Sequence, residues 1–147
     1  MKTFPATPIL GGRASGPALF TDQAINITAA FTKPTNLLPW KRSEFQDKHH
    51  PWRGLNIKGK IIFIPACIGS THTGLVVLDL VRFGLGPAAI VVEDPDPLLV
   101  SGVVLSEVWY QRGIPMVSCP IAPFADAIRP GTIAEVNGDT GAVVLRD

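Results

Sequence analysis

The chain has 147 residues, of which 46% are hydrophobic and only 17% are charged, and it contains 14 glycines and 14 prolines. So many prolines exclude a coiled coil and so much apolar content excludes a disordered tail, so we expect a single domain over residues 1–147. The net charge of +1 offers no electrostatic reason to expect a nucleic acid or an anionic membrane as a partner.

The first predicted elements are short strands in residues 1–58, a segment rich in Pro, Gly, Thr and Asn. Two apolar patches between turn-forming residues, 18–20 and 25–27, are interpreted as such strands. Residues 33–53 are predicted to form a long loop, which contains two of the three tryptophans and seven Lys, Arg or His residues. Loops of this length are often functional or interface segments.

The clearest periodicity lies in the centre of the chain and predicts a strand, a helix and a second strand. Residues 60–65 are a β-branched apolar run of the length of a buried strand, and residues 88–92 are another. Between them, residues 73–83 carry apolar side chains at helical spacing and are followed by glycines that end the helix. Crossovers of this kind place their two strands parallel.

The same alternation continues toward the C-terminus. Residues 97–109 are predicted to form a helix after an Asp-Pro turn, and residues 114–117 to form a third parallel strand. Residues 132–136 and 142–145 flank a glycine-rich turn, which is typical of a β-hairpin. An α/β centre between strand-rich ends predicts a small layered α/β domain with a mixed sheet.

Neither a membrane span nor a metal site is predicted. The longest apolar stretches, residues 61–68 and 87–92, are far shorter than the roughly 20 residues that a spanning helix requires, and prolines interrupt the N-terminal segment that a signal peptide would use. Cys67 and Cys119 lack a close-spaced metal or redox pattern, so we expect a reducing, cytoplasmic location. The mean hydropathy of +0.28 is high for a small domain and indicates apolar surface kept for a partner subunit.

The most informative stretch is residues 67–74, where the first central strand ends and the helix begins. This position is the ligand end of an open α/β sheet. Backbone N–H groups at a helix start are unpaired and carry partial positive charge, so the loop is suited to hold a carboxylate or phosphate and to stabilise an alkoxide on Ser70 or Thr71. From the residue types alone, the alternative that Ser70 or Thr71 is a helix N-cap and Gly69 a turn residue stays open.

Six modest motifs occur in a fixed order along residues 10–145. In that order they resemble the small subunit of the aconitase X family, and together they are more specific than any one of them. The motifs are His50-Pro51-Trp52-Arg53-Gly54, Gly59-Lys60, Gly69-Ser70, Gly86-Pro87-Ala88-Ala89-Ile90, Ser101-Gly102-Val103-Val104 and Gly113-Ile114-Pro115-Met116-Val117.

This resemblance implies a swivelling β/β/α domain that works with a separate large aconitase X-type subunit. It implies that Ser70 is a catalytic base, which takes the proton alpha to the carboxylate of a small-molecule substrate, and that Gly69, Thr71 and His72 bind the substrate. It also implies that this chain alone binds no cofactor and that the partner holds an iron or iron–sulfur cluster. The known reactions of the family are dehydration of cis-3-hydroxy-L-proline and of phosphorylated mevalonate, and we favour the first.

The chain departs from the family pattern in three places. Residues 32–39 stand where the family usually carries Gly-Gly-x-Asp-Pro, and Ile68 replaces the usual basic residue before Gly69. His72-Thr73-Gly74 occurs where a second serine is typical. We expect these changes to affect the substrate more than the class of reaction.

Two other functions stay open. The Gly69–Gly74 stretch is also similar to the loop of swivelling phosphohistidine domains, in which His72 would carry the phosphoryl group. Alternatively the chain is a non-catalytic assembly module, whose aromatic side chains are interface anchors or ordinary core residues: Trp40, Trp52, Trp109 and Phe45. Cys67 is interpreted either as a cluster contact or as a small buried hydrophobe.

Overall fold

The strands of the computed structural model, which describes residues 1–147, form one mixed eight-stranded sheet in the order β1-β8-β7-β3-β4-β5-β6-β2. The pairs β3–β4, β4–β5 and β5–β6 are parallel, and the other four pairs are antiparallel. The strands are Lys2–Pro5 (β1), Thr7–Leu10 (β2), Arg13–Phe20 (β3), Ile61–Ala66 (β4), Ala89–Asp94 (β5), Met116–Ser118 (β6), Ile133–Asn137 (β7) and Ala142–Arg146 (β8). The helices are Ile27–Phe31 (α1), Thr73–Arg82 (α2), Pro97–Tyr110 (α3) and Ala122–Ala125 (α4), with 3₁₀ helices Pro34–Leu37 (η1) and Pro39–Lys41 (η2).

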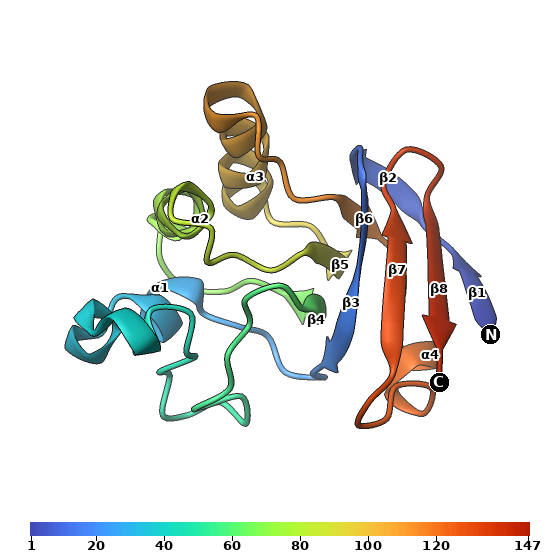
Figure 1. Cartoon of the computed structure of the whole chain (residues 1–147), viewed down its shortest axis with the longest axis horizontal. Helices are drawn as coiled ribbons and strands as arrows, with labels where there is room; N and C mark the ends of the chain where they lie inside the picture. Colours follow the sequence, from blue (N-terminus) through green and yellow to red (C-terminus); the bar gives the residue numbers. More distant parts are fainter.

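The sheet folds over itself into two layers, and β3 belongs to both because its two halves pair with different strands. Residues 13–17 of β3 pair with β7, whereas residues 18–20 pair with β4. At the other side, the N-terminal segment changes layer at Ala6, since β1 pairs with β8 and β2 pairs with β6. With α1, α2 and α3 on the far side of β4 and β5, the molecule has three layers in the order β, β, α (Figure 1).

Two hydrophobic cores fill the spaces between these layers. Alternate residues of β4 point to opposite faces, so that Ile62 and Ile64 join the core under the helices, while Ile61 and Phe63 join the core between the sheets. The neighbouring β5 divides in the same way. This two-sided burial explains why the central strands are continuous apolar runs rather than alternating ones. The predicted β/β/α architecture is confirmed.

The central predictions are confirmed to within one or two residues, as are the helix from residue 97 and the C-terminal hairpin. The strand predicted at residues 25–27 is wrong. Ile25 forms only an isolated bridge with Cys67, and Asn26 caps α1, because its Oδ1 accepts a hydrogen bond of 3.0 Å from the Ala29 N–H. The helix begins at Ile27, directly after this cap, so the extended backbone stops at Asn26.

The segment 33–53 holds more regular structure than a plain loop, since it contains η1 and η2. It is fixed to the helical layer by buried side chains. Phe45 and Trp52 are 0% and 3% exposed, and the Ser43 hydroxyl donates to the Leu85 carbonyl over 2.9 Å. The segment therefore covers the edge of the core under α1 and α2.

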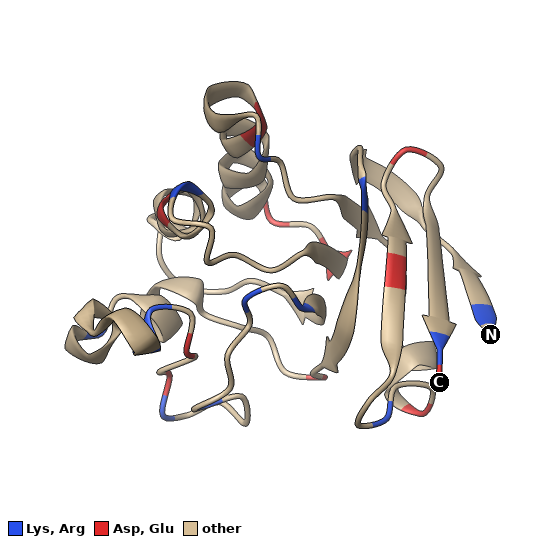
Figure 2. Cartoon of the chain, in the orientation of Figure 1, with Lys and Arg blue, Asp and Glu red and all other residues tan.

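Basic and acidic residues are interspersed along the chain and do not gather on one layer (Figure 2). None of the helices combines the length and the hydropathy that a membrane crossing needs.

Candidate active site

The loop between β4 and α2, residues 67–72, lies at the carboxyl end of the parallel strands. Two backbone hydrogen bonds fix its start beside the segment that leads into α1. The Ile25 N–H donates to the Ala66 carbonyl over 3.0 Å, and the Ile68 N–H donates to the Ile25 carbonyl over 2.8 Å. The loop therefore leaves the sheet in contact with Asn26.

Gly69 is required by its own backbone and by its neighbour. Its φ of +96° lies in the left-handed region, which residues with a side chain rarely adopt. A Cβ atom at this position would also lie 2.8 Å from Cγ of Asn26 and closer still to the amide nitrogen of that side chain. The glycine lets the Asn26 amide pack directly on the loop.

Ser70 is half-buried and its hydroxyl is held by the residue two positions later. The Ser70 Oγ accepts a hydrogen bond of 3.0 Å from the His72 N–H and lies 3.1 Å from the imidazole Nδ1 of His72. The Ser70 carbonyl accepts a hydrogen bond of 2.9 Å from the Thr73 hydroxyl. Ser70, Thr71 and His72 are therefore fixed as one tight turn.

The interpretation of Ser70 or Thr71 as the N-cap residue of α2 is wrong. His72 occupies the N-cap position, and its side chain caps no backbone N–H. The physical reason is the turn, in which Ser70 Oγ binds the N–H of His72 and not an N–H within the helix.

Three successive backbone N–H groups of the loop, those of Gly69, Ser70 and Thr71, have no acceptor within the chain. Gly69 and Thr71 are exposed, so these donors are accessible to a ligand. Unpaired backbone N–H groups that follow one another form sites for anions. The loop has the donors that a carboxylate needs, whereas the N–H of His72 is already occupied by Ser70.

A groove of about 700 Å³ extends from His72 along α2. Three of its apolar side chains are exposed, those of Leu37, Leu75 and Phe83, at 81%, 62% and 46%. Lys33 and Arg42 add positive charge to the same groove, and Asp79 adds a negative charge. The candidate site is thus an open edge of the domain and not an enclosed cavity.

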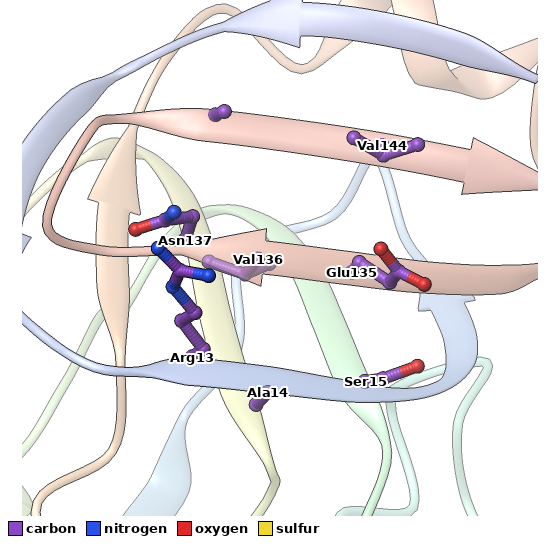
Figure 3. Close-up of a pocket in the computed structure, with 8 residues that line it drawn as sticks. Arg13, Ala14, Ser15, Glu135, Val136, Asn137 and Val144 are labelled. Carbon is purple, nitrogen blue, oxygen red and sulfur yellow. The ribbon is translucent and has the colours of Figure 1, made fainter.

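A second hollow, of about 440 Å³, lies on the outer face of the β3–β7–β8 layer, and no residue of the Ser70 loop lines it. Figure 3 shows Arg13 reaching toward Asn137, with Ser15 and Glu135 farther along the strands. Glu135 is held by Arg146, whose nitrogen lies 3.0 Å from Oε1. This hollow is formed by strand residues alone and takes no part in the candidate site.

The donor set of this chain does not fit a metal ion or cluster. No three His, Cys, Asp or Glu side chains lie together in ligand geometry. Burial, and secondly the charge of Asp96, raises the pKa of the Cys67 thiol from 9.0 to about 12, so it stays protonated and is a poor ligand at neutral pH. Burial, and secondly Glu93, raises the pKa of Cys119 too. Both cysteines belong to the apolar cores.

The aromatic residues considered as interface anchors fall into two groups. Phe45 and Trp52 belong to the core, where the ring of His50 packs 4.8 Å from that of Phe45. Trp40 and Trp109 are 70% and 59% exposed. Core packing is the role of the first pair.

Asn26 is the residue at this site that the sequence analysis missed. Its Oδ1 is used by the Ala29 N–H, which fixes the orientation of the amide and leaves the NH₂ group against Gly69. The signal was present in the sequence as an Asn before a short helical segment, but nothing local indicates that this segment meets residue 69.

Comparison with known proteins identifies the family. The model of the aconitase X swivel domain matches residues 3–145. The phosphomevalonate dehydratase small subunit of Methanocella arvoryzae is 31% identical over 137 residues, which cover 93% of this chain and 94% of that protein. The cis-3-hydroxy-L-proline dehydratase of Pseudomonas aeruginosa is 31% identical over 113 residues, which cover 74% of this chain but only 17% of that longer protein.

The fold agrees with this assignment. The crystal structure of Thermococcus kodakaraensis aconitase X in its holo-form superposes over the full length of both chains with a TM-score of 0.82, at 23% sequence identity. The chain therefore belongs to the aconitase X family and is the swivel domain of a dehydratase, of the kind that the archaeal relative carries as a separate small subunit.

Proposed function

We propose that this chain is the small subunit of an enzyme that dehydrates cis-3-hydroxy-L-proline and that Ser70 is the base of that reaction. The observation that carries the proposal is the turn at residues 69–72 within an aconitase X swivel domain: a serine hydroxyl bonded to a backbone N–H stands beside three unpaired N–H groups. A hydroxy acid needs both parts, a base for its alpha proton and donors for its carboxylate.

In this proposal the backbone N–H groups of the loop bind negative charge and the Ser70 oxygen takes up a proton. The N–H groups of Gly69 and Thr71 bind the substrate carboxylate, which makes the alpha proton more acidic by drawing charge toward the oxygens. Ser70 takes that proton as an alkoxide, and the His72 N–H at 3.0 Å stabilises the negative oxygen. Removing one such fixed donor typically lowers kcat by about 10²–10³-fold.

The partner in this proposal is a large aconitase X-type subunit. The Pseudomonas aeruginosa relative matches over only 17% of its own length, so in that protein a similar domain is joined to a much larger polypeptide. The iron or iron–sulfur centre is assigned to the large subunit because the donor set of this chain does not fit one.

A phosphorylated substrate is the second candidate. Lys33 and Arg42 line the groove that adjoins His72, and cationic side chains there suit the phosphate of phosphomevalonate. The archaeal relative carries that substrate in its name. Its identity of 31% equals that of the hydroxyproline enzyme, and it extends over more of this chain, 93% against 74%.

The test is to co-produce the chain with the large subunit from the same genome and to measure dehydration of cis-3-hydroxy-L-proline and of phosphomevalonate. We expect turnover of the first and a loss of about 10²–10⁴-fold in kcat for Ser70→Ala, the usual contribution of a positioned base. Ser15→Ala on the exposed outer sheet is the matched control and should retain full activity.

The outcomes separate the candidates. If only phosphomevalonate is dehydrated, the second substrate replaces cis-3-hydroxy-L-proline in the proposal. If Ser70→Ala retains activity, Ser70 is not the base. A complex that dehydrates neither compound, in which His72 becomes phosphorylated by phosphoenolpyruvate, supports the phosphohistidine alternative.

A further inference from the structure

We propose that His72 accepts the hydroxyl proton of Ser70 and thereby generates the alkoxide that acts as base. The inference rests on the proposed role of Ser70 and adds to it the group that activates the serine. It assigns to His72 a part in proton transfer in place of the substrate contact expected from the sequence.

The geometry provides one donor and one acceptor for the same oxygen. The His72 N–H donates to Ser70 Oγ over 3.0 Å, and the ring Nδ1 of the same residue lies 3.1 Å from that oxygen. Since the backbone donor fills one lone pair of Oγ, the serine proton is directed at Nδ1 when the imidazole carries its own proton on Nε2. A nucleophilic or basic oxygen paired in this way with a histidine is the general pattern of an activated serine.

No other side chain of this chain is placed to activate Ser70. No further side chain forms a hydrogen bond with Oγ, and the residue before Gly69 is Ile68, which is 56% exposed and cannot titrate. Cys67 faces the apolar core with its pKa raised to about 12. An unassisted serine hydroxyl is a weak base at neutral pH.

Hydrogen bonds of the surrounding residues hold Ser70 and His72 in their relative positions. The Thr73 hydroxyl binds the Ser70 carbonyl over 2.9 Å, and the His72 carbonyl accepts the Val76 N–H over 3.1 Å in the first turn of α2. The pair is therefore fixed by the start of the helix and does not depend on a partner to form.

The proton and electron balance closes within one turnover. The Ser70 proton moves to Nδ1, and the alkoxide then takes the alpha proton of the substrate. The electrons of that C–H bond form the double bond as the C–O bond to the hydroxyl group breaks. The leaving hydroxide takes the proton from Nδ1 and departs as water, so both residues return to their starting state.

The experiment uses the reconstituted two-subunit complex with cis-3-hydroxy-L-proline or phosphomevalonate, whichever it turns over. His72→Asn keeps a polar atom near the position of Nδ1 but takes up no proton, and His72→Ala removes the ring. We expect kcat of His72→Asn to fall by about 10²–10⁴-fold with KM within about threefold, and added imidazole to raise kcat of His72→Ala by at least about tenfold. His49→Asn, at an exposed histidine, is the matched control and should be unaffected.

Each result decides the inference separately from the role of Ser70. A raised KM with unchanged kcat in His72→Asn assigns the histidine to substrate binding and overturns the proposal, as does full activity in that variant or a failure of imidazole to restore His72→Ala. If Ser70→Ala stays active, the proposed function loses its base whatever His72 does. Size-exclusion chromatography of each complex confirms that the variants assemble.

Discussion

Asn26 connects two segments that meet only at the candidate site. Its Oδ1 caps α1 through the Ala29 N–H, and its NH₂ group packs on Gly69. The same amide thus fixes the start of a helix and one wall of the Ser70 loop. Its NH₂ group forms no hydrogen bond within the chain, so it can add donors to those of the neighbouring loop backbone.

Replacing that amide by a carboxylate separates the two roles. In Asn26→Asp an oxygen still caps α1, so we expect an unchanged melting temperature, but a negative charge replaces the donors beside the loop. Two like charges a few Å apart repel by about 1–4 kcal/mol, so KM of the complex for its carboxylate substrate should rise at least about tenfold. Asn56→Asp is the matched control, because the Oδ1 of Asn56 also accepts a backbone N–H, that of Lys58 at 2.8 Å. An unaltered KM in Asn26→Asp would exclude the residue from the substrate site.

At the scale of elements, the position of the Ser70 loop depends on how α2 packs against α3. The two helices approach at Gly74 and Gly102, where a Cβ atom on Gly102 would lie 2.7 Å from the Cα and the carbonyl oxygen of Gly74. Those atoms are backbone and cannot move aside alone. Gly74 follows Thr73, whose hydroxyl holds Ser70, so a shift of α2 is transmitted to the site.

Gly102→Ala is therefore expected to destabilise the domain although alanine favours a helix. The gain in helix propensity is about 1 kcal/mol, whereas overpacking against fixed backbone costs about 1–3 kcal/mol. Urea unfolding of the variant should show a net loss of stability. Val108→Ala, at a residue of α3 that is 62% exposed, raises helix propensity without the clash and should be neutral or slightly stabilising. Equal stability of the two variants would contradict the close approach.

At the scale of the whole molecule, Phe124 of α4 closes the space between the two sheet layers. Its ring is 1% exposed and lies 4.4 Å from that of Phe4 in β1 and 4.8 Å from that of Phe63 in β4. It therefore ties the N-terminal strand and the central strand together from a helix near the other end of the chain.

Phe124→Ala should lower the free energy of unfolding by about 3–5 kcal/mol, the usual cost of removing a buried phenylalanine. Thermal or urea unfolding measures this. Phe83→Ala, at a ring that is 46% exposed on the groove, should cost much less. If both variants lose the same stability, the ring does not join the layers as the structure indicates.

The sequence by itself determined the elements whose signal is local. The apolar run of β4, the helical spacing of α2, the Asp-Pro start of α3 and the glycine-rich hairpin turn each occupy neighbouring residues, and so the position of Ser70 between a strand and a helix followed without the structure. Periodicity and turn chemistry depend only on residues a few positions apart.

The tertiary structure decided what depends on residues distant in the chain. Only folding divides β3 between two layers, sends β1 and β2 to opposite edges of the sheet and brings Asn26 against Gly69. It also decided that Phe45 and Trp52 are core while Trp40 and Trp109 are exposed. Tryptophan occurs in both groups, so the residue type does not decide burial. Burial follows from which surfaces meet in the fold, and no local sequence pattern records this.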